Sequence, residues 1–180
     1  RQDQGEKKSF TGINLEIAST AKKNGQVEID LDILLVGRET RSLPDALAFT
    51  SHPFIEGLTW NRDACLSLLN SSGIKLKEGS RWRVPAELTE DEKRNLLEAI
   101  SKFTSTKNAT EIMDELVGYT YTLSGEDKRS FLRDAREFST MLNSCGRIRK
   151  AGVGVAICMG DRTKMLEEGE NILLEYRTLL

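Results

Sequence analysis

Residues 134–161 read DAREFSTMLNSCGRIRKAGVGVAICMGD, and this stretch carries most of the information about the fold. Ser124 is a suitable N-cap for a helix over about 127–142, and the apolar residues recur there at helical spacing: Phe131, Ala135, Phe138 and Leu142. Cys145-Gly146 then predicts a turn. Residues 152–159 are apolar, and their pattern leaves strand and helix both open.

Capping residues and glycine stops on either side of this stretch predict further helices. They cover about 12–24 after Thr11, a short segment from Ser42 to about 50, a segment from Asn61 to Ser72-Gly73, a helix that opens at the Thr89–Glu92 capping box and includes Phe103, a short segment after Asn108, and about 162–180. Alternation of apolar and polar residues predicts strands over 27–36 and 119–123. Because the last helix reaches residue 180 without a stop signal, we expect the natural protein to continue.

Composition limits the class of protein. The 180 residues are 38% hydrophobic and 30% charged, with a formal net charge of −2, which is typical of one globular domain or slightly more. No apolar run is long enough to span a membrane, and no secretion signal opens the chain. Three distant cysteines argue against a disulfide framework, so we expect a cytoplasmic protein.

The same sequence excludes several catalytic sites. A single histidine, His52, and the lack of HExxH and CxxC motifs exclude a zinc hydrolase or a thiol redox enzyme. There is no phosphate-binding P-loop. Gly152-Val153-Gly154 begins a dinucleotide fingerprint, but Ile157 stands where its third glycine belongs.

Basic residues concentrate between 128 and 164. The nine are Lys128, Arg129, Arg133, Arg136, Arg147, Arg149, Lys150, Arg162 and Lys164, against three acidic residues, so the segment carries +6 and the rest of the chain −8. This asymmetry favours a surface that faces phosphates. A solvated helix face with local ion pairs, such as Arg133 with Glu137, explains the same charges and stays open at this point.

Three stretches together resemble the RecJ-type exonucleases of the DHH phosphoesterase superfamily, and the archaeal, GINS-associated members most of all. The matching residues are Asp134–Phe138, Met141–Arg147 and Gly152–Asp161, then Phe10–Asn14, then Gly57-Leu58, Leu68-Leu69 and Gly73-Ile74. The resemblance touches about two thirds of the chain. Arg1–Gly5 is similar to the residues that follow the family's Gly-Asp step.

The resemblance implies a helix-rich α/β fold that is an internal piece of a larger protein. Residues 1–74 would form the C-terminal part of a DHH catalytic domain, 75–126 a core insertion with a small helical or α+β fold, and 127–180 the return to the catalytic domain. In archaeal relatives this kind of insertion binds the replication factor GINS. A eukaryotic subunit of the replicative helicase belongs to the same lineage.

The family's metal-binding motifs are absent from this chain, which has no Asp-His-His. Mn or Mg ions would therefore be held by other parts of the intact protein, a 5′-to-3′ single-strand exonuclease by resemblance, and we expect this chain alone to be inactive. The resemblance points to Arg147 as a phosphate ligand, because a guanidinium can fork across two phosphate oxygens. Asn143, Gly146, Arg149 and Lys150 are weaker candidates for the same contact. The alternative is that Asn143 and Gly146 only end a helix and Arg147 is a surface charge.

Two functions follow. In the first, the basic segment binds single-stranded DNA or RNA for a nuclease. In the second, the chain is a protein-interaction module that docks GINS or another replication protein, and the strand at 117–123 offers an edge to a partner. Trp60 and Trp82 are expected in core or interface packing, and His52 in a loop.

Overall fold

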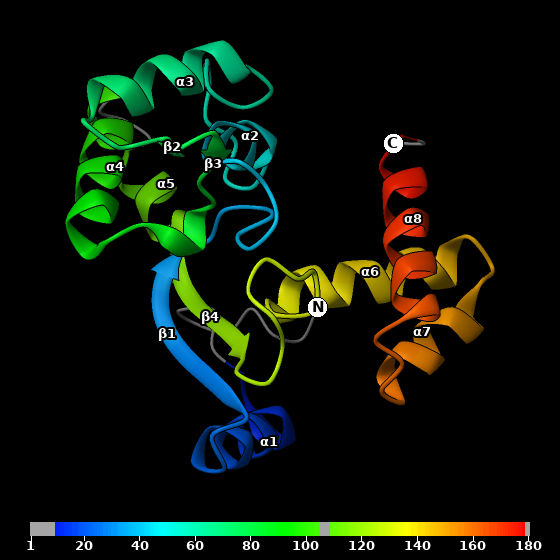
Figure 1. Cartoon of the computed structure of the whole chain (residues 1–180). Coiled ribbons are helices and arrows are strands. Elements are labelled where there is room, and N and C mark those ends of the chain that lie inside the picture. The colour runs from blue at the N-terminus through cyan, green and yellow to red at the C-terminus, as the bar shows by residue number, and fades with distance from the viewer. Residues whose placement is uncertain (1–9, 105–108, 179–180) are drawn as a thin grey trace.

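The computed structural model describes residues 10–104 and 109–178 and confirms a helix-rich α/β fold (Figure 1). In chain order the elements are α1 (Gly12–Lys23), β1 (Val27–Ile33), α2 (Leu43–Phe49), α3 (Arg62–Ser71), β2 (Lys77–Glu78), β3 (Arg81–Trp82), the 3-10 turn η2 (Pro85–Glu87), α4 (Glu90–Phe103), α5 (Ala109–Leu116), β4 (Val117–Leu123), α6 (Ala135–Arg147), α7 (Ala151–Cys158) and α8 (Lys164–Thr178). Arg1–Gly5, the expected cap Asn108 and the end of the last helix at Leu180 lie outside the described residues.

Local capping explains why most helices begin where the sequence predicts. The Ser42 hydroxyl accepts from the Asp45 N–H and the Asn61 side chain from the Ala64 N–H, while Thr89 and Glu92 complete the reciprocal capping box. Each such contact satisfies a helix N–H that has no partner within the helix. Thr11 precedes α1 as predicted, but its side chain makes no capping hydrogen bond.

One apolar cluster holds α2, α3, α4 and α5 together. Its buried members run along the chain from Ile33 to Leu116, and Leu43, Leu69, Leu96 and Ile100 are at most 1% exposed. This cluster continues across the predicted boundary between residues 74 and 75, because Ile74 and Leu88 both belong to it. The division into 1–74, 75–126 and 127–180 therefore stays a prediction.

Strands β1 and β4 form a two-stranded antiparallel ribbon below this cluster (Figure 1), with Val27 opposite Leu123 and Ile33 opposite Val117. The predicted strand over 27–36 ends at Ile33. The alternation also breaks near that end: Asp32 is buried and Leu31 is 63% exposed. Asp32 is buried because Arg38 and Lys93 both lie 3.0 Å from its carboxylate, which compensates the charge.

The C-terminal helices α6, α7 and α8 pack around a second, smaller cluster of Leu132, Met141, Ile157 and Leu173. The ambiguous segment 152–159 is thus part of a helix, α7. The predicted helix over 127–142 is wrong at both ends, since α6 begins at Ala135 and continues through Arg147. Asp134, not Ser124, is the N-cap, and its carboxylate accepts from the N–H groups of Arg136 (2.8 Å) and Glu137 (3.2 Å).

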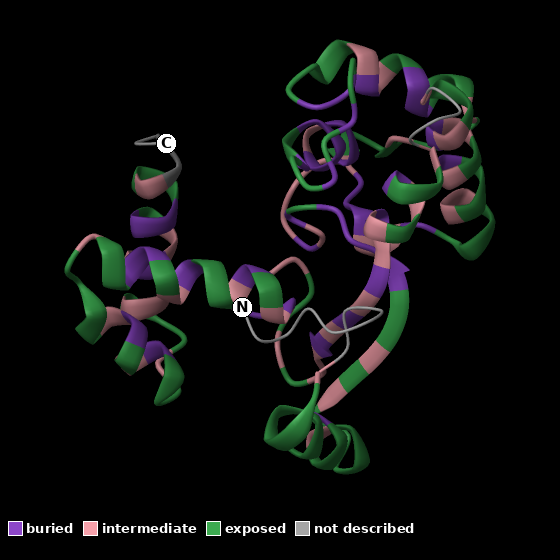
Figure 2. Ribbon diagram, turned by 180° about the vertical axis from the view of Figure 1, so that it is seen from behind, coloured by how far each residue is buried: buried purple, intermediate pink, exposed green. Residues whose placement is uncertain are grey.

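Helix α1 lies at the far end of the ribbon from the large cluster and contacts β1 (Figure 1). Figure 2 shows it coloured almost entirely as exposed. Within α1, Ala18 is buried but Leu15 is 49% exposed. No helix among the described residues is both long enough and apolar enough to cross a membrane.

Candidate nucleic-acid interface

Four polar side chains line up along one exposed face of α6, which we call the α6 face: Arg136, Thr140, Asn143 and Arg147. Steps of four, three and four residues return to the same side of a helix with 3.6 residues per turn. The buried residues Glu137, Met141, Ser144 and Cys145 lie toward the core side. At 1.5 Å per residue the α6 face extends about 16 Å.

The sequence predicted that the helix ends near Leu142 and that a turn follows at Cys145-Gly146, but residues Asn143–Arg147 form the last turn of α6. Gly146 is helical and exposed, and a Cβ added there would meet no atom within 4 Å. The turn lies farther along, at Ile148–Lys150, where Arg149 has a φ of 61°. The predicted turn at Cys145-Gly146 is therefore wrong, because helix α6 runs straight through it.

Arg147 is exposed, and its guanidinium carbon lies 5.8 Å from the centroid of the Tyr176 ring on α8. Among residues 10–104 and 109–178 no carboxylate comes within ion-pair distance of it. A cation held beside an aromatic ring keeps its charge available and its position defined. The nearby Lys150 differs, because its ammonium lies 2.6 Å from the Glu168 carboxylate, and this hydrogen bond raises the pKa of Lys150.

The other basic residues of the 128–164 segment divide into two groups. Arg129 pairs with Glu87 at 2.8 Å, Arg133 approaches Glu39 at 3.7 Å, and Arg162 pairs with Glu126 at 2.6 Å. Lys128, Arg136, Arg149 and Lys164 are exposed, and in the described part of the chain they join no ion pair. The ion pair expected between Arg133 and Glu137 does not form. Glu137 instead points to the loop after β1.

A buried hydrogen-bond network fixes the start of α6. The Glu39 N–H donates to one oxygen of Glu137 at 2.7 Å, and the Thr40 hydroxyl donates to the other at 2.5 Å. Burial raises the pKa of Glu137 to about 7, although both hydrogen bonds act in the opposite direction. The α6 face is thereby anchored on the loop that leads into the large cluster. Sequence reasoning missed this role of Glu137.

A cavity of about 400 Å³ opens beside the α6 face. Arg136 and Thr140 of α6 line it, together with Tyr176 of α8 and Arg41 of the loop before α2. The other lining groups are Leu34, Leu35, Val36, Gly37, Ser51, His52, Asp134, Glu137 and Leu173. Three of the lining residues therefore belong to the α6 face or contact it. Neither Arg41 nor Tyr176 was predicted as a site residue from the sequence.

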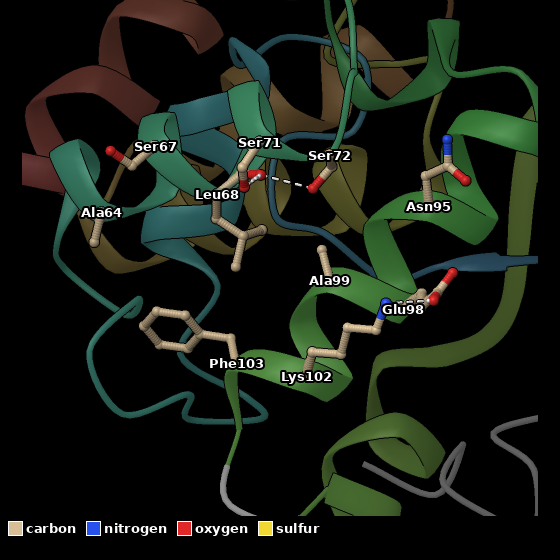
Figure 3. A pocket seen from close by; sticks show the side chains of 10 residues that line it. All are labelled: Ala64, Ser67, Leu68, Ser71, Ser72, Asn95, Glu98, Ala99, Lys102 and Phe103. Carbon is tan, nitrogen blue, oxygen red and sulfur yellow. Dashed lines mark hydrogen bonds and ion pairs between the residues drawn. The ribbon is translucent and has the colours of Figure 1, made fainter.

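A second hollow, of about 900 Å³, lies between α3 and α4 (Figure 3). Small side chains form much of its surface, among them Ala64, Ser67 and Ala99. Phe103, at the end of α4, is 47% exposed. Figure 3 shows the Glu98–Lys102 ion pair at the edge of this hollow, which we call the α3–α4 groove.

Two kinds of chemistry were tested against the described residues, metal binding and thiol reactivity at Cys145. No group of three or more His, Cys, Asp and Glu side chains there is placed to hold a metal ion, so these residues do not fit the family's Mn or Mg site. Burial raises the pKa of Cys145, which disfavours a reactive thiolate. Trp82 is half-buried as expected, with the Lys77 ammonium 4.3 Å from its ring centroid, whereas Trp60 is 71% exposed.

Comparison with known protein families gives one match. Residues 35–117, just under half of the chain, match the family model of the DHH-CID domain. No curated protein matches the chain. The family match supports a RecJ-like protein of the DHH superfamily, and the helix-rich α/β fold is consistent with a fragment of one. The matched residues coincide closely with the large apolar cluster from Ile33 to Leu116.

Proposed function

We propose that this chain belongs to a RecJ-like nuclease of the archaeal, GINS-associated type, and that its α6 face holds the phosphate backbone of single-stranded DNA or RNA. The observation that carries the proposal is the row of Arg136, Thr140, Asn143 and Arg147 along one exposed helix face, with both guanidiniums free of carboxylate partners within the described residues. The resemblance of the Met141–Arg147 stretch to the family motif supports it.

The chemistry of this face suits a backbone rather than a base sequence. Guanidiniums bind phosphate oxygens through two N–H groups, and hydroxyl and amide side chains add single hydrogen bonds. Such contacts are independent of sequence and weaken as salt rises. Because Arg147 lies at the C-terminus of α6, the helix dipole favours its cation but does not itself attract a phosphate. Binding must therefore come from the side chains.

Phosphodiester hydrolysis by the intact parent, in the 5′-to-3′ direction, is a proposal that rests on the family resemblance. In that family Mn or Mg supplies the activation of water. The described residues offer no place for such an ion, so we derive no metal-dependent step from them. Their part is to hold and orient the strand. We place this activity in the cytoplasm, where the unpaired Cys65, Cys145 and Cys158 stay reduced.

Fluorescence anisotropy with labelled single-stranded DNA and RNA tests the proposal. Arg147→Gln should weaken binding severalfold, because it removes a charged phosphate contact. Arg94→Gln is the matched control. Arg94 is an exposed cation on α4, a helix of the large apolar cluster, and its loss should leave the affinity for DNA and RNA unchanged. Equal affinities of the Arg147→Gln and Arg94→Gln variants would contradict a role for the α6 face.

The α3–α4 groove favours a second function, the docking of a replication protein of the GINS type. Both helices lie within the DHH-CID match, and small side chains with an exposed Phe103 suit an apolar helix from a partner. The strand edge, in contrast, is partly covered, since Leu123 donates to the Arg133 carbonyl at 2.7 Å. Isothermal titration with purified GINS tests this: Phe103→Ala should weaken binding, and Arg147→Gln should not. Binding that Arg147→Gln weakens and Phe103→Ala does not would contradict the α3–α4 groove as the docking site.

A further inference from the structure

The side chain of Arg41 is unusual because it is half-buried and its Nε atom has no hydrogen-bond partner among the described residues. Its Nε atom is fully enclosed and has no acceptor in the described structure. Burial lowers the pKa of Arg41, whereas the charges of Glu137 and Asp45 raise it. A dehydrated donor without an acceptor costs free energy, so such groups commonly mark a place where a ligand or an ion completes the hydrogen bond.

The carboxylates near Arg41 are engaged elsewhere. Asp45 accepts from the Arg62 guanidinium at 2.6 Å and from the Ser42 hydroxyl. Glu137 accepts from Glu39 and Thr40 with its two oxygens. None of these carboxylate oxygens reaches the Arg41 guanidinium, which leaves its N–H groups for an acceptor from outside.

The backbone is shaped to place Arg41 where it is. Gly37 has a φ of 75°, and its carbonyl accepts from the Arg41 N–H at 2.8 Å, which closes a tight turn. A Cβ on Gly37 would lie 2.3 Å from Cγ of Arg41. Only glycine therefore leaves room for this side chain, whose guanidinium also stacks 4.5 Å from the centroid of the Phe49 ring.

Arg41 shares its cavity with groups that also recognise phosphate. Arg136 and the Thr140 hydroxyl line it from α6, and Tyr176 lines it from α8. Tyr176 is the same ring that lies beside Arg147. Asp134 and Glu137 line the cavity as well, but the Asp134 carboxylate accepts from α6 backbone N–H groups, and Glu137 is largely protonated below its pKa of about 7.

We infer that this cavity is a phosphate subsite, in which Arg41 and Arg136 clamp one phosphate of the strand that crosses the α6 face past Arg147. The inference rests on the proposed function and deepens it. A strand lying along the α6 face passes the mouth of the cavity, because Arg136 and Thr140 belong to both. The bound phosphate would accept hydrogen bonds from the Arg41 guanidinium, whose side chain lines the cavity.

Nuclear magnetic resonance of the arginine Nε–H groups in the full 180-residue chain tests the inference, at a pH below about 7. Arg41→Met identifies the Arg41 signal by its loss from the spectrum. Titration with inorganic phosphate should shift the Arg41 signal and leave that of Arg94 in place. Titration with a short oligo-dT should shift the Arg41 and Arg147 signals together. Arg136→Gln, a change of an exposed side chain, should weaken both titrations at least about fivefold.

The two titrations separate the inference from the function on which it rests. If phosphate leaves the Arg41 signal unmoved, the inference is wrong. If oligo-dT binds and shifts Arg147 but not Arg41, the strand avoids the cavity, which overturns the inference while the proposed function stands. If oligo-dT does not bind but phosphate shifts Arg41 in an Arg136-dependent way, the phosphate site is supported and the proposed function of the α6 face is rejected.

Discussion

The carboxylate of Glu137, on α6, accepts a 2.7 Å hydrogen bond from the backbone N–H of Glu39, which is 98 residues earlier in the chain. This contact joins the C-terminal helices to the loop between the ribbon and the large apolar cluster. It therefore sets the position of the α6 face relative to Arg41, and any change at Glu137 should affect stability and the proposed site together.

The first prediction concerns pH and Glu137. Because burial raises the pKa of Glu137 from its ordinary 4.5 to about 7, the folded protein keeps a proton that the unfolded chain releases between these values. The stabilisation by this group is thus complete below about pH 4.5 and is lost as the pH rises through about 7. Glu137→Gln should flatten this part of the stability profile by on the order of 2–3 kcal/mol.

Urea unfolding at a series of pH values measures this effect. Glu16→Gln, which changes an exposed glutamate of α1, is the control and should leave the profile as in the wild type. A Glu137→Gln profile that keeps the wild-type slope between pH 4.5 and 7 would contradict the raised pKa of Glu137.

The second prediction compares two glycines in helices. A Cβ on Gly169 would lie 2.7 Å from Cδ1 of Ile157 and 3.2 Å from Sδ of Met141, whereas one on Gly146 would meet nothing within 4 Å. Gly169→Ala should destabilise the chain by about 1–3 kcal/mol through overpacking. Gly146→Ala should stabilise it by up to about 1 kcal/mol, because alanine is the better helix former. Thermal or urea unfolding of both variants measures these two changes in stability.

Gly146→Ala also tests an expectation from the sequence. If a phosphate approaches the backbone at Gly146, the added methyl group should weaken oligonucleotide binding even though it stabilises the fold. Unchanged affinity in a stabilised variant would limit the contact to side chains of the α6 face.

The sequence predicted those features that depend on neighbouring residues. The caps at Ser42, Asn61 and Thr89 are local hydrogen bonds, and they lie where expected. The start of α6 was misplaced because Ser124 and Asp134 are both good N-caps, and only long-range contacts decide between them. Ser124 donates its N–H to the Gln26 carbonyl at 3.0 Å, which keeps it in the turn after β4.

The candidate site was predicted in part for the same reason. The Asn143 and Arg147 pair could be found because the family motif is continuous in sequence, and the α6 face follows once the helix extends through Arg147. Arg41 could not be found, since its place in the same cavity as Arg136 depends on the Gly37 turn and on the fold between them. The burial of Asp32 was also not predicted from the sequence, because one of the cations that pair with it, Lys93, is distant in the chain.

The third prediction concerns activity. The isolated chain should not degrade single-stranded DNA when Mn is added, as its described residues hold no cluster of metal ligands. In the full-length parent, Arg147→Ala should lower the rate of cleavage more than tenfold while the protein still folds, which corresponds to the loss of one charged phosphate contact. Nucleolytic turnover by the purified chain would contradict its predicted inactivity. An unchanged rate of cleavage in the parent variant would contradict a role for Arg147.

The most direct test of the central claim is the salt dependence of single-strand binding by the chain. Each phosphate contact that is lost should reduce the slope of log affinity against log salt concentration by about 0.7 for a single strand. The double variant Arg136→Gln with Arg147→Gln should therefore show a slope about 1.4 smaller than the wild type. A slope equal to that of the wild type would mean that the α6 face does not hold a nucleic-acid backbone.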